Sequence, residues 1–284
     1  MVRLDRFLAD ESSFSRSDVK KMIRAGRVSV NGSFDVKPEL KIDPENDCVK
    51  ADGVQIMHTG RVCLMMNKSA GVLSATEDAR DRTVIDLVKE PYANKLFPVG
   101  RLDKDTEGLL LLTNDGMLSH NLLSPAKHVS KTYFVIITGA PDEQLREKFR
   151  EGLDIGDKKP TLPSLLMFLS VDGDFLEEHI TQSANGEDCR EQLPHGMISP
   201  LQMKEFCIRS IALADYARCG ENECCAAVSV TEGRFHQIKR MFSACGREVR
   251  FLKRIAMGGL MLDPDLEPGY YRELTKEEWK LLEG

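Results

Sequence analysis

The sequence predicts an α+β protein of two domains: a small N-terminal α/β unit over residues 1–59, and a larger α+β domain over residues 61–284 with a mixed or antiparallel sheet. A chain of 284 residues with 42% hydrophobic and 30% charged residues is long enough for two modest cores. Helix-like and strand-like hydrophobic patterns alternate along it without an internal repeat or a low-complexity tract. The chain is therefore neither fibrous nor disordered as a whole.

The first domain begins with two helix patterns. Apolar residues recur at helical spacing over residues 4–8. Ser15, with Asp18 three residues later, has the spacing of an N-cap pair at the start of a second helix, and Gly26 supplies a C-terminal stop. We therefore expect two short helices before residue 26.

A hairpin pattern and a row of basic residues complete this domain. Alternating apolar residues on both sides of Asn31-Gly32, over residues 28–36, predict a tight β-hairpin. At about 100° per residue, four basic side chains fall on one side of the second helix, and we call them the cationic stripe: Arg16, Lys20, Arg24 and Arg27. Such a stripe can bind phosphates, or it can be a solvated helix face.

The second domain mixes strand and helix patterns. An Asn114-Asp115-Gly116 turn separates a strand from a helix, and acidic residues after Pro141 suit the start of another helix. A Thr-x-x-Glu capping box opens the last helix. We expect strands over residues 62–66, 109–113, 132–138 and 227–230, and helices over residues 83–89, 117–123, 236–245 and 275–282.

Charge is spread unevenly along the chain. The formal net charge is −6, yet the segment from Asp172 to Glu223 has eleven acidic and four basic residues, which leaves the rest at +1. Residues 231–254 carry seven basic and two acidic side chains. Basic patches beside an acidic segment suit a nucleic-acid-binding protein, and the acidic segment should lie away from the phosphates. We therefore expect residues 172–223 to be an acidic insertion, a surface elaboration that a short linker could replace.

Several function classes lose their support. The sequence has no phosphate-binding Gly-x-x-x-x-Gly-Lys loop, no dinucleotide fingerprint, no Gly-x-Ser-x-Gly elbow and no His-Glu-x-x-His helix. No apolar stretch approaches the roughly 18 residues of a membrane span, and charges near the N-terminus argue against a signal peptide. The eight cysteines include no Cys-x-x-Cys pair. We expect a cytoplasmic protein with no disulfide, no metal site and no membrane partner.

A dense polar stretch runs from Gly100 to Gly108 and leads directly into an apolar strand. Its sequence is Gly-Arg-Leu-Asp-Lys-Asp-Thr-Glu-Gly, with three carboxylates and two cations. Taken alone, it could be an ordinary charged turn. Together with the Thr-x-Asp-Gly turn at residues 113–116, Lys131-Thr132-Tyr133, and Gly-Arg-Phe-His-Gln-Ile-Lys-Arg at residues 233–240, it resembles the RsuA-like family of pseudouridine synthases. The N-terminal domain likewise resembles the S4-like RNA-binding domain that these enzymes carry.

The resemblance implies a catalytic set. Asp103 would be the nucleophile that attacks the uridine, Tyr133 the ring that stacks on the target base, and Lys239 the cation paired with Asp103. A nearby cation keeps a carboxylate ionised, and an aromatic ring holds a detached base by stacking. No cofactor is required, because the isomerisation has no net redox change. From the residues alone, the position of Tyr133 at the start of an apolar strand favours a core aromatic.

Further residues would contact the RNA. The target uridine must leave its base stack, and Arg101 could fill the vacated space or bind a phosphate. Placed by their motif, Arg234, His236 and Gln237 would line the site, although His236 could equally be a structural histidine. The S4-like resemblance also favours RNA binding by the cationic stripe.

The resemblance also suggests which RNA is modified. Lys239, where many pseudouridine synthases have Arg, indicates the branch that acts on small-subunit (16S) ribosomal RNA. Ser69 stands where the family usually has proline, from which we expect only a local loop change. We therefore expect a monomeric enzyme of ribosomal RNA modification. Two alternatives stay open: large-subunit (23S) RNA as the target, or a non-catalytic RNA-binding factor in ribosome assembly.

Overall fold

The computed structural model describes residues 1–12, 14–169 and 196–283, and the chain divides into two compact units, residues 1–61 and 62–284. Each unit has its own buried core. In the first unit the elements are β1 (Val2–Arg3), α1 (Leu4–Glu11), α2 (Arg16–Arg24), β2 (Val28–Val30), β3 (Lys41–Ile42), β4 (Val49–Ala51) and β5 (Val54–Gln55).

Both expected helices of the first unit are confirmed. The Ser15 hydroxyl caps α2 by accepting a hydrogen bond from the backbone N–H of Asp18 at 3.2 Å. Gly26, at a φ of +68°, allows the left-handed turn after the helix. Apolar side chains of α1 and α2 pack on β2 and β4 in one small core.

The predicted hairpin is wrong. The Asn31-Gly32 turn forms, with Val30 and Ser33 exchanging backbone hydrogen bonds, but residues 34–36 form no strand. Instead β2 pairs antiparallel with β4, whose Val49 and Ala51 are buried. Phe34 is exposed, so the second arm of a hairpin would bury less apolar surface than β4 does.

The second unit is built on a mixed sheet. Among the described residues nine strands form it, in the order β10-β11-β9-β12-β8-β6-β14, with β13 paired to β12 and β7 to β8. The strands are β6 (Cys63–Lys68), β7 (Phe97–Pro98), β8 (Glu107–Thr113), β9 (Lys131–Thr138), β10 (Leu165–Leu169), β11 (Glu223–Val230), β12 (Val249–Met257), β13 (Leu260–Met261) and β14 (Tyr271–Glu273).

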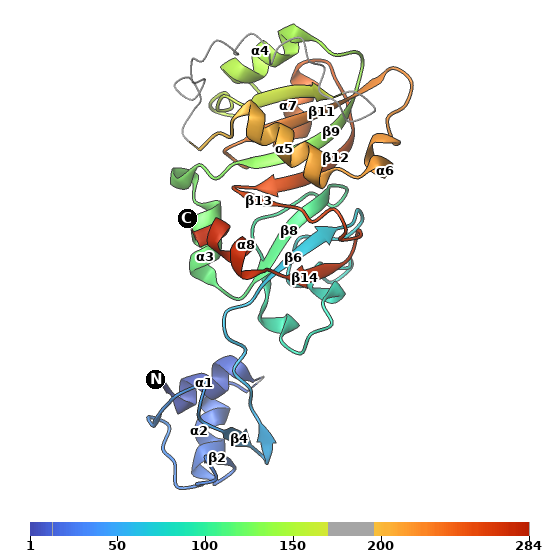
Figure 1. Ribbon diagram of the computed structural model, residues 1–284. Helices are drawn as coiled ribbons and strands as arrows, with labels where there is room; N and C mark the ends of the chain where they lie inside the picture. The colour runs from blue at the N-terminus through green and yellow to red at the C-terminus, as the bar shows by residue number, and fades with distance from the viewer. Residues whose placement is uncertain (13, 170–195, 284) are drawn as a thin grey trace. The chain divides into compact units, whose positions relative to one another are not determined.

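Helices cover both faces of this sheet (Figure 1). Alternate side chains of β9 enter different clusters: Val135 and Ile137 pack under α4 and α7, whereas Phe134 and Ile136 pack under α5 and α6. On the other half, α3 and α8 cover β6 and β8. The helices are α3 (Gly116–Leu123), α4 (Glu143–Glu151), α5 (Pro200–Ser210), α6 (Leu213–Tyr216), α7 (Gln237–Ala244) and α8 (Lys276–Glu283), with 3-10 turns η1 (Ile85–Leu87), η2 (Ala93–Lys95) and η3 (Pro125–Lys127).

One close backbone approach joins the two halves of the sheet. β8 and β12 are parallel neighbours, and only two residue pairs are in register, Glu107 with Lys253 and Gly108 with Arg254. A Cβ atom on Gly108, which has a φ of +100°, would lie 2.2 Å from the carbonyl oxygen of Arg254. Only glycine fits there, so the motif's second glycine sets the spacing between the halves.

Most helices and strands expected in this unit are present, but one predicted helix is wrong. Residues 83–89 form no α-helix but only the single 3-10 turn η1. Val84, Ile85 and Val88 are β-branched, and the Asp86 carboxylate accepts hydrogen bonds from Thr83 that close a local turn. The sequence pattern also missed β10 and β12; the second of these carries Arg250, Lys253 and Arg254.

The expected surface elaboration is also wrong where the structure describes it. The prediction for residues 172–223 lies partly outside the described residues, but residues 196–223 include α5 and α6, which pack on β9, β11 and β12. Six of its apolar side chains are buried: Ile198, Met203, Phe206, Cys207, Ile211 and Tyr216. Replacing this part by a short linker would uncover the sheet.

Candidate active site

Asp103 lies in the loop between β7 and β8, four residues before Glu107, where β8 begins its pairing with β12. Leu102 anchors it: its backbone N–H donates to the Ser74 hydroxyl at 3.0 Å, and its carbonyl oxygen accepts from the same hydroxyl. The Thr106 N–H donates to the Asp103 carbonyl at 3.1 Å. These bonds leave the Asp103 side chain, 26% exposed, directed toward the cleft.

The buried ammonium group of Lys68 holds the same loop through hydrogen bonds to its backbone. Its Nζ donates to the carbonyl oxygens of Ser69, Lys104 and Thr106 at 3.0, 3.2 and 2.8 Å. Burial lowers its pKa to about 8, while the carboxylates of Asp105 and Glu107 act in the opposite direction. One cation therefore ties the end of β6 to both sides of the Asp103 loop.

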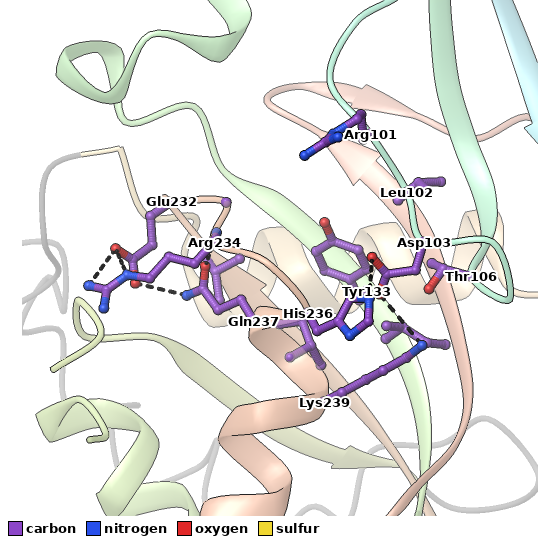
Figure 2. A pocket seen from close by; sticks show the side chains of 14 residues that line it. Arg101, Leu102, Asp103, Thr106, Tyr133, Glu232, Arg234, His236, Gln237 and Lys239 are labelled. Atoms are coloured by element: carbon purple, nitrogen blue, oxygen red, sulfur yellow. Dashed lines mark hydrogen bonds and ion pairs between the residues drawn. The ribbon is translucent and has the colours of Figure 1, made fainter. Parts of the chain in front are cut away.

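Lys239 and His236 approach Asp103 from the N-terminal end of α7. His236 has a φ of +48°, an uncommon value for a residue other than glycine, and precedes the first helical residue. Lys239 lies three positions later, almost one helical turn. Both side chains therefore leave the same end of the helix and meet the loop before β8 (Figure 2).

Asp103, Lys239 and His236 lie close together with Asp105. Lys239 Nζ lies 3.5 Å from Asp103 Oδ2 and 2.6 Å from Asp105 Oδ1, and His236 Nε2 lies 3.5 Å from Asp103 Oδ1. Burial acts to raise the pKa of Asp105, but the hydrogen bond and charge of Lys239 outweigh it and lower that pKa. Lys239 is thus shared by two carboxylates.

Tyr133 completes the apolar side of the cleft. It is half-buried on β9 and packs against two hydrophobic clusters, one from each half of the sheet. The cleft is open to solvent, and it is lined by Asp103, Thr106, Tyr133, His236, Lys239 and nine other residues. An aromatic wall beside a carboxylate and an ammonium can hold a planar base next to a nucleophile.

Arg234 and Gln237 line the cleft, but protein groups occupy their polar atoms. Arg234 donates to the carboxylates of Glu232 and Asp157 and to the carbonyl oxygens of residues 159–160. Gln237 donates to Glu232 at 2.8 Å and accepts from the Arg234 backbone N–H at 3.0 Å. They fix the loop before α7, and their contact with RNA stays a prediction.

Arg101 is placed differently. Its side chain is exposed, lines the cleft, and makes no hydrogen bond or ion pair with any residue that the structure describes. Figure 2 shows it apart from the Asp103, His236 and Lys239 cluster.

Within residues 1–12, 14–169 and 196–283, no group of three or more His, Cys, Asp or Glu side chains could hold a metal ion, and no helix is long and apolar enough to cross a membrane.

In the first unit, the structure divides the cationic stripe. Arg16, Lys20 and Arg24 are exposed on α2. Arg27 lies beyond the end of the helix and forms a two-point ion pair with Asp52, so its placement on the helix was wrong. The break follows from Gly26, which ends the helix before Arg27.

Replacing Arg16, Lys20 and Arg24 together by Ala should weaken RNA binding and flatten its salt dependence. Each phosphate contact releases condensed counterions, so three lost contacts reduce the slope of log Kd against log salt by about two to three units. Binding to ribosomal RNA transcripts at several salt concentrations measures this. Arg6→Ala, which removes a cation already paired with Asp10, is the control. An unchanged slope would make the stripe a solvated helix face.

Lys68 predicts a pH dependence of stability. Between its folded pKa of about 8 and its ordinary value of 10.5, the unfolded chain binds more protons than the folded chain, so this group makes the free energy of unfolding rise with pH. Relative to Lys68→Met, the wild type should gain at most about 1.4 kcal/mol per pH unit across that window. Urea unfolding from pH 7 to 10 measures the difference. Lys104→Met, at an exposed lysine of the same loop, is the control, and a difference for Lys68→Met that stays constant across the window would contradict the lowered pKa of Lys68.

Sequence reasoning missed two residues of this site. Asp105 was visible only as one of three carboxylates in the loop, and nothing marked it as the closest partner of Lys239. Lys68 was visible only as a residue next to Ser69. In both cases the available signal was a polar residue beside an apolar strand. The groups that Asp105 and Lys68 bind lie far away in the sequence, so the pattern did not indicate them.

Comparisons with known proteins find matches to both units of the chain. A family model described as RNA pseudouridylate synthase matches residues 62–244, and a model of the S4 domain matches residues 2–34. The chain is 38% identical over 282 residues to an uncharacterized RNA pseudouridine synthase of Bacillus subtilis, covering 99% of this chain and 98% of that protein.

Two further relatives cover the chain. Ribosomal small subunit pseudouridine synthase A of Escherichia coli is 32% identical over 278 residues, which cover 98% of each chain. A crystal structure described as a pseudouridylate synthase is 30% identical, with a TM-score of 0.58, and the match covers 99% of this chain and all of that one.

Proposed function

The chain belongs to the RNA pseudouridylate synthase family, and from that premise we propose that it converts one uridine of small-subunit ribosomal RNA to pseudouridine, with Asp103 as the nucleophile. It is an enzyme with an S4 domain at its N-terminus. The observation that carries the proposal is the approach of Lys239 Nζ to within 3.5 Å of Asp103 Oδ2 in a cleft walled by Tyr133.

The reaction breaks the bond between C1′ and N1 and forms a bond between C1′ and C5. Lys239 keeps the Asp103 carboxylate ionised, and this carboxylate attacks C1′ while the C1′–N1 bond breaks and its electron pair stays on the uracil. The detached uracil turns on the face of Tyr133, and C5 then bonds to C1′ and displaces the Asp103 carboxylate. C5 loses its hydrogen as a proton and N1 takes up a proton, so the product is an isomer of uridine. The base never leaves the cleft.

The target uridine can enter this cleft only after it leaves the base stack of the RNA. Extrusion costs a few kcal/mol, which contacts elsewhere must offset. Arg101 is exposed at the cleft and can bind a phosphate or fill the vacated space. The exposed cations of α2 supply sequence-independent affinity. A ribosomal RNA substrate also accords with a cytoplasmic, monomeric protein.

The proposal is tested with unmodified transcripts of both ribosomal RNAs that carry tritium at C5 of uridine. The purified enzyme should release one tritium per small-subunit transcript, because the C5 hydrogen is lost in the reaction. Release from the large-subunit transcript alone would reassign the target. Binding without release from either transcript would favour a non-catalytic assembly factor.

A further inference from the structure

Phe235 presents a large apolar ring to solvent directly beside the active site. It is 72% exposed, the most of any aromatic side chain in the described ranges. The residue lies between Arg234 and His236, both of which line the cleft, yet Phe235 itself is not part of the lining. An exposed ring at this position is unused by the protein core.

The ring is nevertheless held in place. It stacks on the imidazole of His236, with ring centroids 3.8 Å apart and an angle of 18° between the planes. Arg240 donates to the Phe235 carbonyl oxygen at 3.2 Å, and the same guanidinium pairs with Asp157. The backbone and the ring of Phe235 therefore each have a partner within the protein.

His236 connects this ring to the nucleophile. Its Nε2 lies 3.5 Å from Asp103, while one of its faces carries Phe235. Its backbone adopts the left-handed conformation, which is unfavourable for a residue other than glycine. The imidazole of His236 therefore lines the cleft and also contacts the exposed ring of Phe235.

We propose that Phe235 is a stacking platform for the base of a nucleotide next to the target uridine, an inference that rests on the proposed function. The target occupies the cleft, so a neighbour in the RNA chain emerges where Phe235 lies, on the outer side of His236. Extrusion of the uridine leaves that neighbour without its stacking partner. A flat exposed ring accepts any base, because every base has a π face.

The test separates RNA affinity from the chemical step. On the small-subunit transcript, Phe235→Ala should raise the RNA concentration at half-maximal single-turnover rate about tenfold, the scale of one lost base stack, and leave the saturated rate within about threefold. Phe235→Tyr should behave as wild type, whereas Phe235→Leu should behave as Phe235→Ala. Leu201→Ala, which removes an exposed apolar side chain of α5, is the matched control and should change neither value.

Each contrary outcome has a distinct meaning. Full activity of Phe235→Leu, or an unchanged half-saturation with Phe235→Ala, would overturn the stacking role while leaving the enzyme's function intact. A lower saturated rate with unchanged half-saturation would show that Phe235 only positions His236, which also overturns it. A wild-type enzyme that releases no tritium from either transcript would instead contradict the proposed function, and with it this inference.

Discussion

Replacing Asp103 by Asn is expected to lower the rate of pseudouridine formation by at least about a thousandfold while RNA affinity stays nearly unchanged. Asn has nearly the same shape, but its amide is a poor nucleophile, and loss of a covalent nucleophile costs several powers of ten. Single-turnover tritium release and a separate binding titration measure the two quantities. A rate within about tenfold of wild type would remove Asp103 from this role.

Asp105 offers a matched control for this substitution. It lies in the same loop, its carboxylate is 2.6 Å from the same Lys239 ammonium, and its side chain is 73% exposed. Asp105→Asn makes the same chemical change and also removes a negative charge beside Lys239, but leaves the nucleophile in place. We expect a loss of no more than about tenfold; a loss as large as that of Asp103→Asn would contradict the assignment of the nucleophile to Asp103 alone.

Replacing Asp215 by Leu should destabilise the second unit by about 3–5 kcal/mol, because it leaves a buried cation without its partner. Lys253 Nζ lies 2.6 Å from Asp215 Oδ2, and each side chain is only 6% exposed. Lys253 is on β12, and Asp215 is on α6, within the segment expected to be a surface elaboration. The free energy of unfolding in urea measures the loss.

The matched variant removes both charges. Asp215→Leu combined with Lys253→Met should recover most of the lost stability, because no unpaired charge then remains buried. A double variant as unstable as Asp215→Leu alone would mean that packing of α6, rather than the ion pair, stabilises this region.

The same segment also contacts the strand that follows the Asp103 loop, because Arg218 Nη1 lies 3.3 Å from Oε1 of Glu107 at the start of β8.

Local patterns predicted much of the fold. The helix starts at Ser15 and Thr275 were predicted from residue pairs three positions apart, and in both the side chain accepts a hydrogen bond from the backbone N–H three residues later. The apolar runs that form β8 and β9 were also visible, since both strands are buried over nearly their whole length.

Features that depend on remote partners were not predictable. The Asn31-Gly32 turn was recognised, but pairing of β2 with β4 is decided by which strand buries more apolar surface. β12 was missed because its cations looked solvated. In fact Lys253 pairs with Asp215, and Arg254 Nε donates to the Leu109 carbonyl at 2.7 Å. Burial and partner identity are properties of the folded chain.

The candidate site divides in the same way. Asp103, Tyr133 and Lys239 were named from motifs, and the structure brings all three to one cleft, although their roles stay predictions. The protein partners of Arg234 and the support from Lys68 came only from the structure. Motif position shows which residues meet at the site, but not whether a side chain contacts RNA or the protein itself.

The proposed activity is the formation of one pseudouridine in small-subunit ribosomal RNA, with Asp103 as the nucleophile. It is tested most directly by mapping pseudouridine in both ribosomal RNAs from cells that lack the gene and carry either the wild-type or the Asp103→Asn protein. We predict that one small-subunit pseudouridine is absent without the gene, returns with the wild type, and stays absent with Asp103→Asn. Unchanged maps of both RNAs, or full restoration by Asp103→Asn, would contradict the account.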